Sequence, residues 1–302
     1  MSDATAPPPG QGNLRGILWM VLFTLSISAM HTAIRHVADG LHPFEIAFFR
    51  LLFSLVVVLP WFVKLGLRPL RTRRFGLMAV RGVLNLACML AFFVALTITP
   101  LAEVTALLFL APVFTTVLAV VVFGERAGLR RWGAIAAGFA GALVVLRPGF
   151  AGIGPGPILA IFAAVTWAVC MLIIKSLGRT ESSVTITIYM VLVMTPLSLV
   201  PALLVWQWPS WEQVAWLAAI GVLGGVGQMA MAEALRVGET LAVMPVDFTK
   251  LIWISILAYL AFGEVPDLFT WTGGAMIFAA TAFIAWREHV LKKPPKPPAV
   301  LA

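Results

Sequence analysis

Asp247 and Lys250 are opposite charges inside an apolar run, residues 240–262, that is long enough to cross a membrane. In a helix, a spacing of three residues places both side chains on one face, where they can form an ion pair. A charge near the bilayer midplane costs at least ~2.5–3.5 kcal/mol, so each side chain needs a partner or water. Two interpretations stay open. The pair could be structural and neutralise itself, or it could be a cavity site in which Lys250 meets an anionic or carbonyl group while Asp247 handles a proton or cation.

Two further runs carry polar side chains at helical spacing. Arg81 and Asn85 share one face of the run 75–97, where they could line a cavity, although Arg81 also lies close enough to the run's end to extend to the membrane interface. Gln228, in the run 211–235, is expected to form a hydrogen bond at a cavity wall or to another helix. Trp253 could stack on a planar ligand or pack between helices.

Glu45 and Arg50 belong to the run 44–63. Their spacing of five residues does not place them on one helix face, so each is expected to have a partner on another helix. His31, in the run 16–34, could carry a proton near physiological pH or donate to a backbone carbonyl. Glu125 and Glu264 follow the ends of runs and are expected to form turns.

The composition is that of a membrane protein. Apolar residues make up 61% of the 302 and charged residues 11%, and the mean hydropathy is +1.00, whereas a soluble domain has roughly 25% charged residues. The net charge of +8 could suggest nucleic acid, but the basic residues lie in short loops between apolar runs, where the bias of cytoplasmic loops explains them. Cys88 and Cys170 lie inside apolar runs, so neither a disulfide framework nor a metal site is expected.

Ten apolar runs predict an all-α integral membrane protein with ten transmembrane helices. None of them alternates strictly between apolar and polar residues as a barrel strand does. Short connections make neighbouring helices antiparallel. The runs are Gly16–Ile34, Phe44–Val63, Phe75–Thr97, Leu101–Phe123, Arg131–Leu146, Gly156–Lys175, Val184–Trp206, Trp211–Leu235, Thr240–Phe262 and Phe269–Arg287.

Lys and Arg residues orient these helices. With an internal amino terminus, sixteen of the 21 basic residues fall in internal segments and two, Arg35 and Arg147, in external ones. Cytoplasmic loops carry the excess of basic residues, so both termini are predicted to be cytoplasmic. Residues 1–14 are expected to form a disordered tail without a signal peptide, and residues 289–302 a basic, proline-rich tail.

The chain contains an internal duplication. The stretch Ala95–Trp132 recurs 139 positions later as Ala234–Trp271, and both copies contain Phe-Gly-Glu with a Trp seven positions after its Glu. The two repeats are predicted to span residues 15–150 and 151–288. Because each holds five helices, an odd number, the second must be inverted relative to the first, as in secondary transporters. Leu108 and Ala111 are the apolar equivalents of Asp247 and Lys250, and this asymmetry favours a functional pair.

These repeats resemble the drug/metabolite transporter superfamily, EamA type, over essentially the whole chain. The resemblance implies a central cavity lined mainly by helices 3, 4, 8 and 9, rocking helices 1, 2, 6 and 7, and peripheral helices 5 and 10. It transfers no substrate-binding motif. The matching segments are His42–Glu45 leading to Phe49-Arg50, Pro100–Ala106 running to Ala111–Phe114, Leu241–Pro245, and the two Phe-Gly-Glu turns Phe123–Glu125 and Phe262–Glu264.

We therefore expect a secondary transporter that moves a small organic metabolite across a bacterial inner membrane by alternating access. A riboflavin-like vitamin, an S-adenosylmethionine-like metabolite and an amino-acid-like metabolite are the candidate substrates, and an exporter of amino acids or drug-like metabolites is the alternative. A membrane enzyme is disfavoured, because His31, His36, His42 and His289 form no cluster in the sequence. We expect no cofactor, no metal and no nucleic acid, and membrane lipid as surroundings. A homodimer and a coupling proton or cation stay open.

Overall fold

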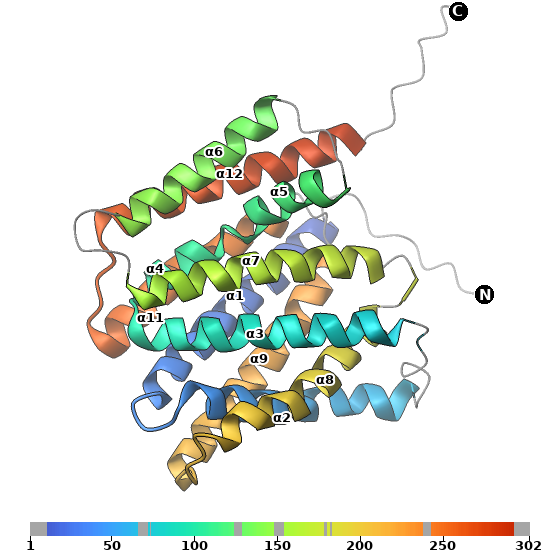
Figure 1. Ribbon diagram of the computed structural model, residues 1–302, viewed down its shortest axis with the longest axis vertical. Coiled ribbons are helices and arrows are strands. Elements are labelled where there is room, and N and C mark those ends of the chain that lie inside the picture. Colours follow the sequence, from blue (N-terminus) through green and yellow to red (C-terminus); the bar gives the residue numbers. More distant parts are fainter. Residues whose placement is uncertain are drawn as a thin grey trace, which may run out of the picture.

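The computed structural model describes residues 11–65, 72, 74–123, 129–147, 154–177, 180–181, 183–237 and 243–292. Both predicted tails lie mostly outside these ranges, as do Glu125 and most of the connections that contain basic residues. Within the described ranges the chain is helical and has no β-strand (Figure 1). The helices are α1 (Gln11–Val37), α2 (Pro43–Leu65), α3 (Phe75–Ile98), α4 (Leu101–Leu108), α5 (Ala111–Phe123), α6 (Leu129–Leu146), α7 (Pro155–Leu177), α8 (Ser183–Leu203), α9 (Trp211–Val237), the 3-10 helix η2 (Met244–Phe248), α11 (Thr249–Phe262) and α12 (Leu268–Lys292).

Five segments are long and apolar enough to cross a membrane by length and composition. They are Leu14–Val37, Phe75–Ile98, Leu101–Leu118, Pro155–Ile174 and Trp211–Met231. The stretches Trp132–Leu146, Ile188–Leu203 and Leu268–Ile284 are shorter but also apolar. Helices that are apolar on all sides can pack against one another inside the bundle and against lipid outside it. The expected all-helical membrane fold is therefore confirmed.

The helices of the two halves pack in matching pairs. The first helix, α1, lies against α9, and its equivalent in the second half, α7, lies against α3. In the same way α2 packs against α9, and α8 packs against α3. The scheme also holds for α1, which packs against η2 and α11, and for α7, which packs against α4 and α5. Two pairs join equivalent helices directly: α2 with α8, and α6 with α12 (Figure 1).

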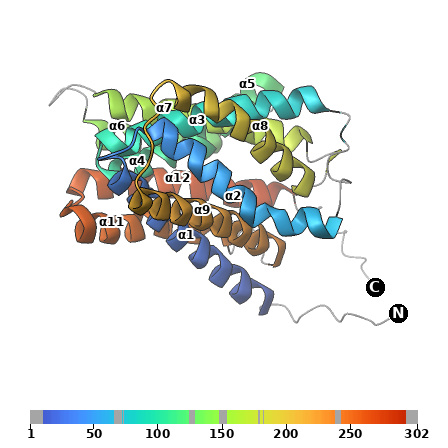
Figure 2. The ribbon, with the colours of Figure 1, turned by 90° about the horizontal axis from the view of Figure 1, so that it is seen from below.

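Most of these helices run along a common direction, and their ends gather at two opposite ends of the bundle. The start of α1 and the end of α12 lie at the same end, together with the starts of α3 and α6 (Figures 1 and 2). We call this the Arg74 end, because Arg74 precedes α3, and we call the opposite end the Arg35 end, because α1 finishes there. An even number of passes brings both chain ends to one side.

Two of the predicted spans are interrupted rather than continuous. The run Leu101–Phe123 divides into α4 and α5, with Phe109 and Leu110 between them and Pro112 in the first turn of α5. Proline lacks an N–H and disfavours an unbroken helix through the preceding turn. The run predicted as Thr240–Phe262 consists of η2 and α11, with residues 238–242 outside the described part. Each predicted run is thus present, but its helix geometry changes near Pro112 and near Pro245. Elsewhere the predicted bounds differ by a few residues, as where α8 ends at Leu203.

Two glycines at equivalent positions allow close helix approaches. Gly82 on α3 lies against Val193 on α8, and Gly221 on α9 lies against Phe53 on α2. A Cβ atom at either glycine would overlap with the facing side chain. The two positions are 139 residues apart, the same spacing as the internal repeat. Small residues at helix interfaces let backbones approach in membranes, where packing replaces the hydrophobic effect as the cause of association.

Candidate functional site

The predicted ion pair between Asp247 and Lys250 is present. Lys250 Nζ lies 2.8 Å from Asp247 Oδ1, and the two side chains are 15% and 20% exposed, respectively. Asp247 belongs to η2 and Lys250 to the first turn of α11, so the pair lies where the helix geometry changes. The ammonium group also lies over two aromatic rings, 5.1 Å from the ring centre of Phe23 and 5.4 Å from that of Phe109. Such cation–π contacts help to hold a charge away from water.

Polar groups of α1 hold this region in place. The Ser28 hydroxyl lies 3.4 Å from the backbone carbonyl oxygen of Lys250, to which it donates. One turn earlier, the hydroxyl groups of Thr24 and Thr249 lie 3.1 Å apart. In apolar surroundings such side-chain contacts satisfy groups that water cannot reach. The first helix therefore forms one wall of the ion-pair site.

His31 extends the site along the same helix. It lies three residues after Ser28 and is buried, with its ring edge-on to Phe92 on α3 at a centroid distance of 4.9 Å. Both Lys250 and Arg50 are within electrostatic reach of the His31 ring. Within the described part of the chain, the ring does not form the expected hydrogen bond to a backbone carbonyl. His31 thus lies between two basic side chains from α11 and α2.

Arg50 on α2 forms the second part of the site. Its Nη1 donates to the Met89 sulfur at 2.8 Å, and its Cζ lies 5.6 Å from the centre of the Phe93 ring. Its Nε is buried without an acceptor among the described residues. Gly224 on α9 leaves room for this guanidinium, because a Cβ atom there would lie 3.2 Å from Nε. The expected partner on another helix is present, but it is a thioether, which is a weak acceptor.

The predicted residues Arg81 and Asn85 lie elsewhere, between α3 and α8. Arg81 donates from Nη1 to the Ile186 carbonyl oxygen at 3.0 Å, and its Nη2 lies 3.6 Å from the Met190 sulfur. Asn85 donates to the Met194 sulfur at 3.3 Å. Both side chains therefore link two helices rather than joining the Asp247–Lys250 pair.

Three other predicted residues have separate surroundings. Glu45 is fully buried and accepts a 2.6 Å hydrogen bond from the backbone N–H of Gln207, in the segment that follows α8. Its second oxygen has no partner in the described part of the chain. Gln228 is exposed on α9. Trp253 lies one turn after Lys250 on α11, and its indole Nε1 is buried without an acceptor among the described residues. Of these three, Trp253 lies nearest the ion pair in sequence.

A network at the Arg35 end includes a residue that the sequence indicated only as a turn former. Arg35 donates from Nη1 to the Thr99 carbonyl oxygen at 2.7 Å, and its Nη2 lies 2.5 Å from Glu264 Oε1. The other oxygen of Glu264 accepts a 3.2 Å hydrogen bond from the backbone N–H of Leu101. The network connects α1, the α3–α4 junction and the end of α11. The recurrence of Phe-Gly-Glu was the signal for Glu264, but sequence alone did not indicate its partners.

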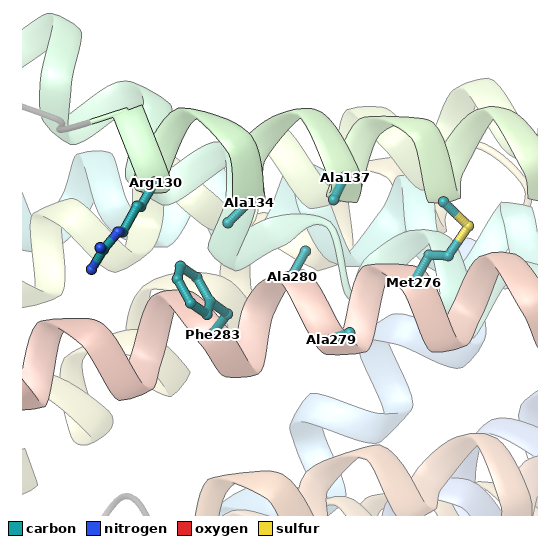
Figure 3. A pocket seen from close by; sticks show the side chains of 7 residues that line it. All are labelled: Arg130, Ala134, Ala137, Met276, Ala279, Ala280 and Phe283. Atoms are coloured by element: carbon teal, nitrogen blue, oxygen red, sulfur yellow. The ribbon is translucent and has the colours of Figure 1, made fainter.

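Two surface hollows of the described part are not lined by the Asp247–Lys250 pair, His31 or Arg50, although Glu264 lines the second of them. One, of about 440 Å³, is a groove between α6 and α12 lined by small apolar side chains with Arg130 at one end (Figure 3). Another, of about 350 Å³, lies beside α11 near Tyr259. Both are almost entirely apolar, so we place the candidate site at the buried charges instead. Among the described residues, no group of three or more His, Cys, Asp or Glu side chains gathers as metal ligands do.

An all-helical bundle with two interrupted apolar helices and a buried ion pair at one interruption is typical of a polytopic membrane transporter. The chain belongs to the EamA-like transporter family, whose sequence profile matches it twice, at residues 14–147 and 154–286. Each of the two matches covers about one half of the chain. Several curated relatives are themselves transporters of small molecules, and the chain is a small-metabolite transporter of this family.

Three of these relatives carry different substrate names. The S-adenosylmethionine uptake transporter of Rickettsia prowazekii (strain Madrid E) is 32% identical over 275 residues, covering 91% of this chain and 94% of the relative. The riboflavin transporter of Vibrio cholerae serotype O1 is 33% identical over 281 residues, with the same coverage. The pseudopaline exporter CntI of Pseudomonas aeruginosa is 24% identical over 270 residues, covering 88% and 94%. A solved crystal structure covers 93% of this chain and 99% of its own, with a TM-score of 0.61 at 20% identity, and shows the fold alone.

Proposed function

We propose that the chain moves its metabolite across a bacterial inner membrane by alternating access, and that the substrate binds between α1, α2, α3 and the η2–α11 junction. In this proposal Lys250 and Arg50 bind polar or anionic groups of the substrate, Asp247 binds a coupling proton or cation, and His31 lies between them. The aromatic rings of Phe23, Phe92, Phe93 and Phe109 supply apolar surface for a planar or hydrocarbon part.

The observation that carries this proposal is the interruption of two helices at matching positions beside a buried ion pair. Transporters bind their substrates where membrane helices are discontinuous, because the interrupted turns leave backbone groups free to contact a ligand. A pair needed only for the scaffold would be expected in both repeats. Leu108 and Ala111 occupy the equivalent positions in the first repeat. The asymmetry favours a role for Asp247 and Lys250 in transport.

The matching helix pairs support ten spans arranged as two inverted repeats. Exchange of the halves converts the largest of these packing pairs into others that are present, such as α1 with α9 into α7 with α3 and α2 with α9 into α8 with α3. We further propose that the Arg74 end faces the cytoplasm. Sixteen of the 21 basic residues belong to segments assigned to that side, and such residues are retained in cytoplasmic loops.

One relative is named for uptake of S-adenosylmethionine and another as a riboflavin transporter, so import of one of these compounds is the first candidate activity. Each compound combines a planar ring system with polar groups, which fits aromatic rings next to buried charges. Export is the second candidate, because a more distant relative is named as an exporter of pseudopaline. Amino-acid-like and drug-like metabolites belong to this second candidate.

The test is uptake of radiolabelled S-adenosylmethionine and riboflavin by right-side-out and inside-out vesicles that contain the protein, with and without an uncoupler. Vesicles without the protein are the control. Uptake above the control by right-side-out vesicles supports import, and uptake only by inside-out vesicles supports export. Loss of accumulation with the uncoupler supports coupling to protons or to the membrane potential. Transport of neither compound in either orientation contradicts the proposed substrates.

A further inference from the structure

We infer that Arg50 binds an anionic group of the substrate, a carboxylate or a phosphate, so that the transported metabolite is anionic or zwitterionic rather than neutral. The inference rests on the proposed transport function and deepens it, because it selects among the candidate substrates by their charge. It also makes Arg50, rather than Lys250, the main anchor for the anion.

Arg50 differs from the other arginines whose hydrogen bonds the structure describes. Arg35, Arg74 and Arg81 each donate to at least one backbone carbonyl oxygen, and Arg147 forms an ion pair with Asp267. Arg50 donates only to the sulfur of Met89 within the described part of the chain. A guanidinium has five N–H donors in a planar fork that matches a carboxylate or phosphate, and a thioether satisfies at most one of them weakly.

The surroundings of Arg50 are also short of negative charge. Asp247 already pairs with Lys250, and Glu45 accepts its hydrogen bond from Gln207. No carboxylate among the described residues forms an ion pair with Arg50. Asp247, Lys250 and Arg50 together carry one excess positive charge. Buried charges are retained where they pair with a partner, and the partner that Arg50 lacks among the described residues is an anion.

Within the described part of the chain, the immediate surroundings of the guanidinium offer it no strong protein acceptor. The buried Nε of Arg50 faces Gly224 on α9. Glycine has no side chain, so Gly224 offers no side-chain acceptor to this edge of the guanidinium. Phe93 and Met89 cover the other side with apolar surface. In such low-dielectric surroundings a charge-assisted bond to a carboxylate is stronger than it is in water.

This assignment separates the two uptake candidates. S-Adenosylmethionine carries an amino-acid carboxylate, whereas riboflavin carries no anionic group at neutral pH. If Arg50 binds the anionic group, the protein should recognise the carboxylate end of S-adenosylmethionine. It should recognise riboflavin only when a phosphate has been added to it. Because carboxylate and phosphate share the chemistry that a guanidinium recognises, both are included in the test.

The experiment measures binding of matched ligand pairs to the purified full chain by thermal shift. The pairs are S-adenosylmethionine with its decarboxylated form, and riboflavin 5′-phosphate with riboflavin. The member of at least one pair that carries the carboxylate or phosphate is expected to raise the melting temperature of the wild type at concentrations at least ten times lower than the member that lacks this group. In Arg50→Met this preference is expected to disappear. The inference is overturned if the wild type binds decarboxylated S-adenosylmethionine or riboflavin more tightly than its partner in the pair and Arg50→Met shows the same preference. The transport proposal would still stand in that case.

A ligand-free comparison decides the case in which none of the four compounds binds. Arg50→Met removes a charge without a protein partner and is expected to raise the melting temperature, by about 2 °C or more. Arg81→Met is the matched control. It removes a guanidinium that already donates to a carbonyl oxygen, and it is expected to lower the melting temperature. If Arg50→Met lowers it as much as Arg81→Met does, Arg50 belongs to the scaffold and the inference fails.

Discussion

Phe109 and Phe248 occupy the same position in the two repeats and lie in contact, with ring centroids 4.5 Å apart. Each lies where the helix geometry of its own run changes, Phe109 between α4 and α5 and Phe248 at the end of η2, directly before α11. The Phe109 ring also lies beneath the ammonium group of Lys250. The two halves of the molecule therefore meet at their interrupted helices, next to the buried ion pair.

Exchange of these two rings for alanine tests that contact. Each single change, Phe109→Ala and Phe248→Ala, is expected to lower the free energy of unfolding by about 3 kcal/mol. The double variant should lose about 0.5–1.5 kcal/mol less than the sum of the two single losses, because either single change already breaks the aromatic pair. Detergent unfolding of the four proteins measures this coupling. Strict additivity would show that the rings act independently.

The equivalent glycines Gly82 and Gly221 should tolerate no side chain. Gly82→Ala and Gly221→Ala are both expected to destabilise the protein and reduce transport, because a Cβ atom would push α8 and α2 away from their partners. Gly76→Ala and Gly133→Ala are matched controls, since a Cβ atom at either position would meet nothing within 4 Å. The controls should be neutral or stabilising by up to about 1 kcal/mol through helix propensity. Equal effects at all four positions would contradict the close approach.

The orientation can be checked with single cysteines in a background without Cys88 and Cys170. Leu129 at the start of α6 and Val265 before α12 are exposed and lie near opposite ends of the bundle. A membrane-impermeant thiol reagent should label Leu129→Cys only from the cytoplasmic side and Val265→Cys only from the outside. Labelling of both from one side of the membrane would rule out the proposed topology.

The network at the Arg35 end should contribute to stability. Glu264→Gln keeps the size of the side chain but removes the charge that Arg35 contacts, and it should lower the free energy of unfolding by about 1–3 kcal/mol. Asp267→Asn is a comparison at the same end, because Asp267 also pairs with an arginine, but it does so at a more exposed site. Its effect should stay below about 1 kcal/mol. A larger loss for Asp267→Asn than for Glu264→Gln would contradict this ranking.

Much of the fold could be predicted from the sequence, because apolar runs, turns and a duplication are local or periodic signals. The Asp247–Lys250 ion pair followed from a spacing of three residues, which places two side chains together in almost any helical segment. The interruptions were not predicted. Pro112 and Pro245 indicated bends, but the exact breaks at Phe109 and Phe248 depend on the contact between the two repeats.

The directions in which side chains face were the hardest feature to predict. A helix that is apolar on all sides has no hydrophobic face that fixes its rotation, so the sequence cannot tell which neighbour a polar residue meets. For Arg81 and Asn85 the sequence left open whether they line a cavity, and for Arg81 also whether it extends to the membrane interface; in the structure both contact α8. Arg50 was expected to have a partner on another helix, and among the described residues that partner is a sulfur atom. Such contacts depend on tertiary packing.

The central claim is that the Asp247–Lys250 pair takes part in transport. Asp247→Asn leaves the buried Lys250 without its partner and should destabilise the protein by about 3–5 kcal/mol. Lys250→Met leaves Asp247 unpaired and should act in the same direction. The double variant Asp247→Asn with Lys250→Met removes both charges together, so its stability should return close to that of the wild type.

The most direct measurement is uptake by proteoliposomes of the wild type and the double variant Asp247→Asn/Lys250→Met, made with protein whose melting temperatures in detergent are matched. The substrate is the compound that the vesicle assay identifies. The account predicts a folded, stable double variant without coupled transport, because the groups that bind the substrate and the coupling ion are gone. Full transport by the neutral double variant would contradict it and would show that the pair serves only to neutralise itself.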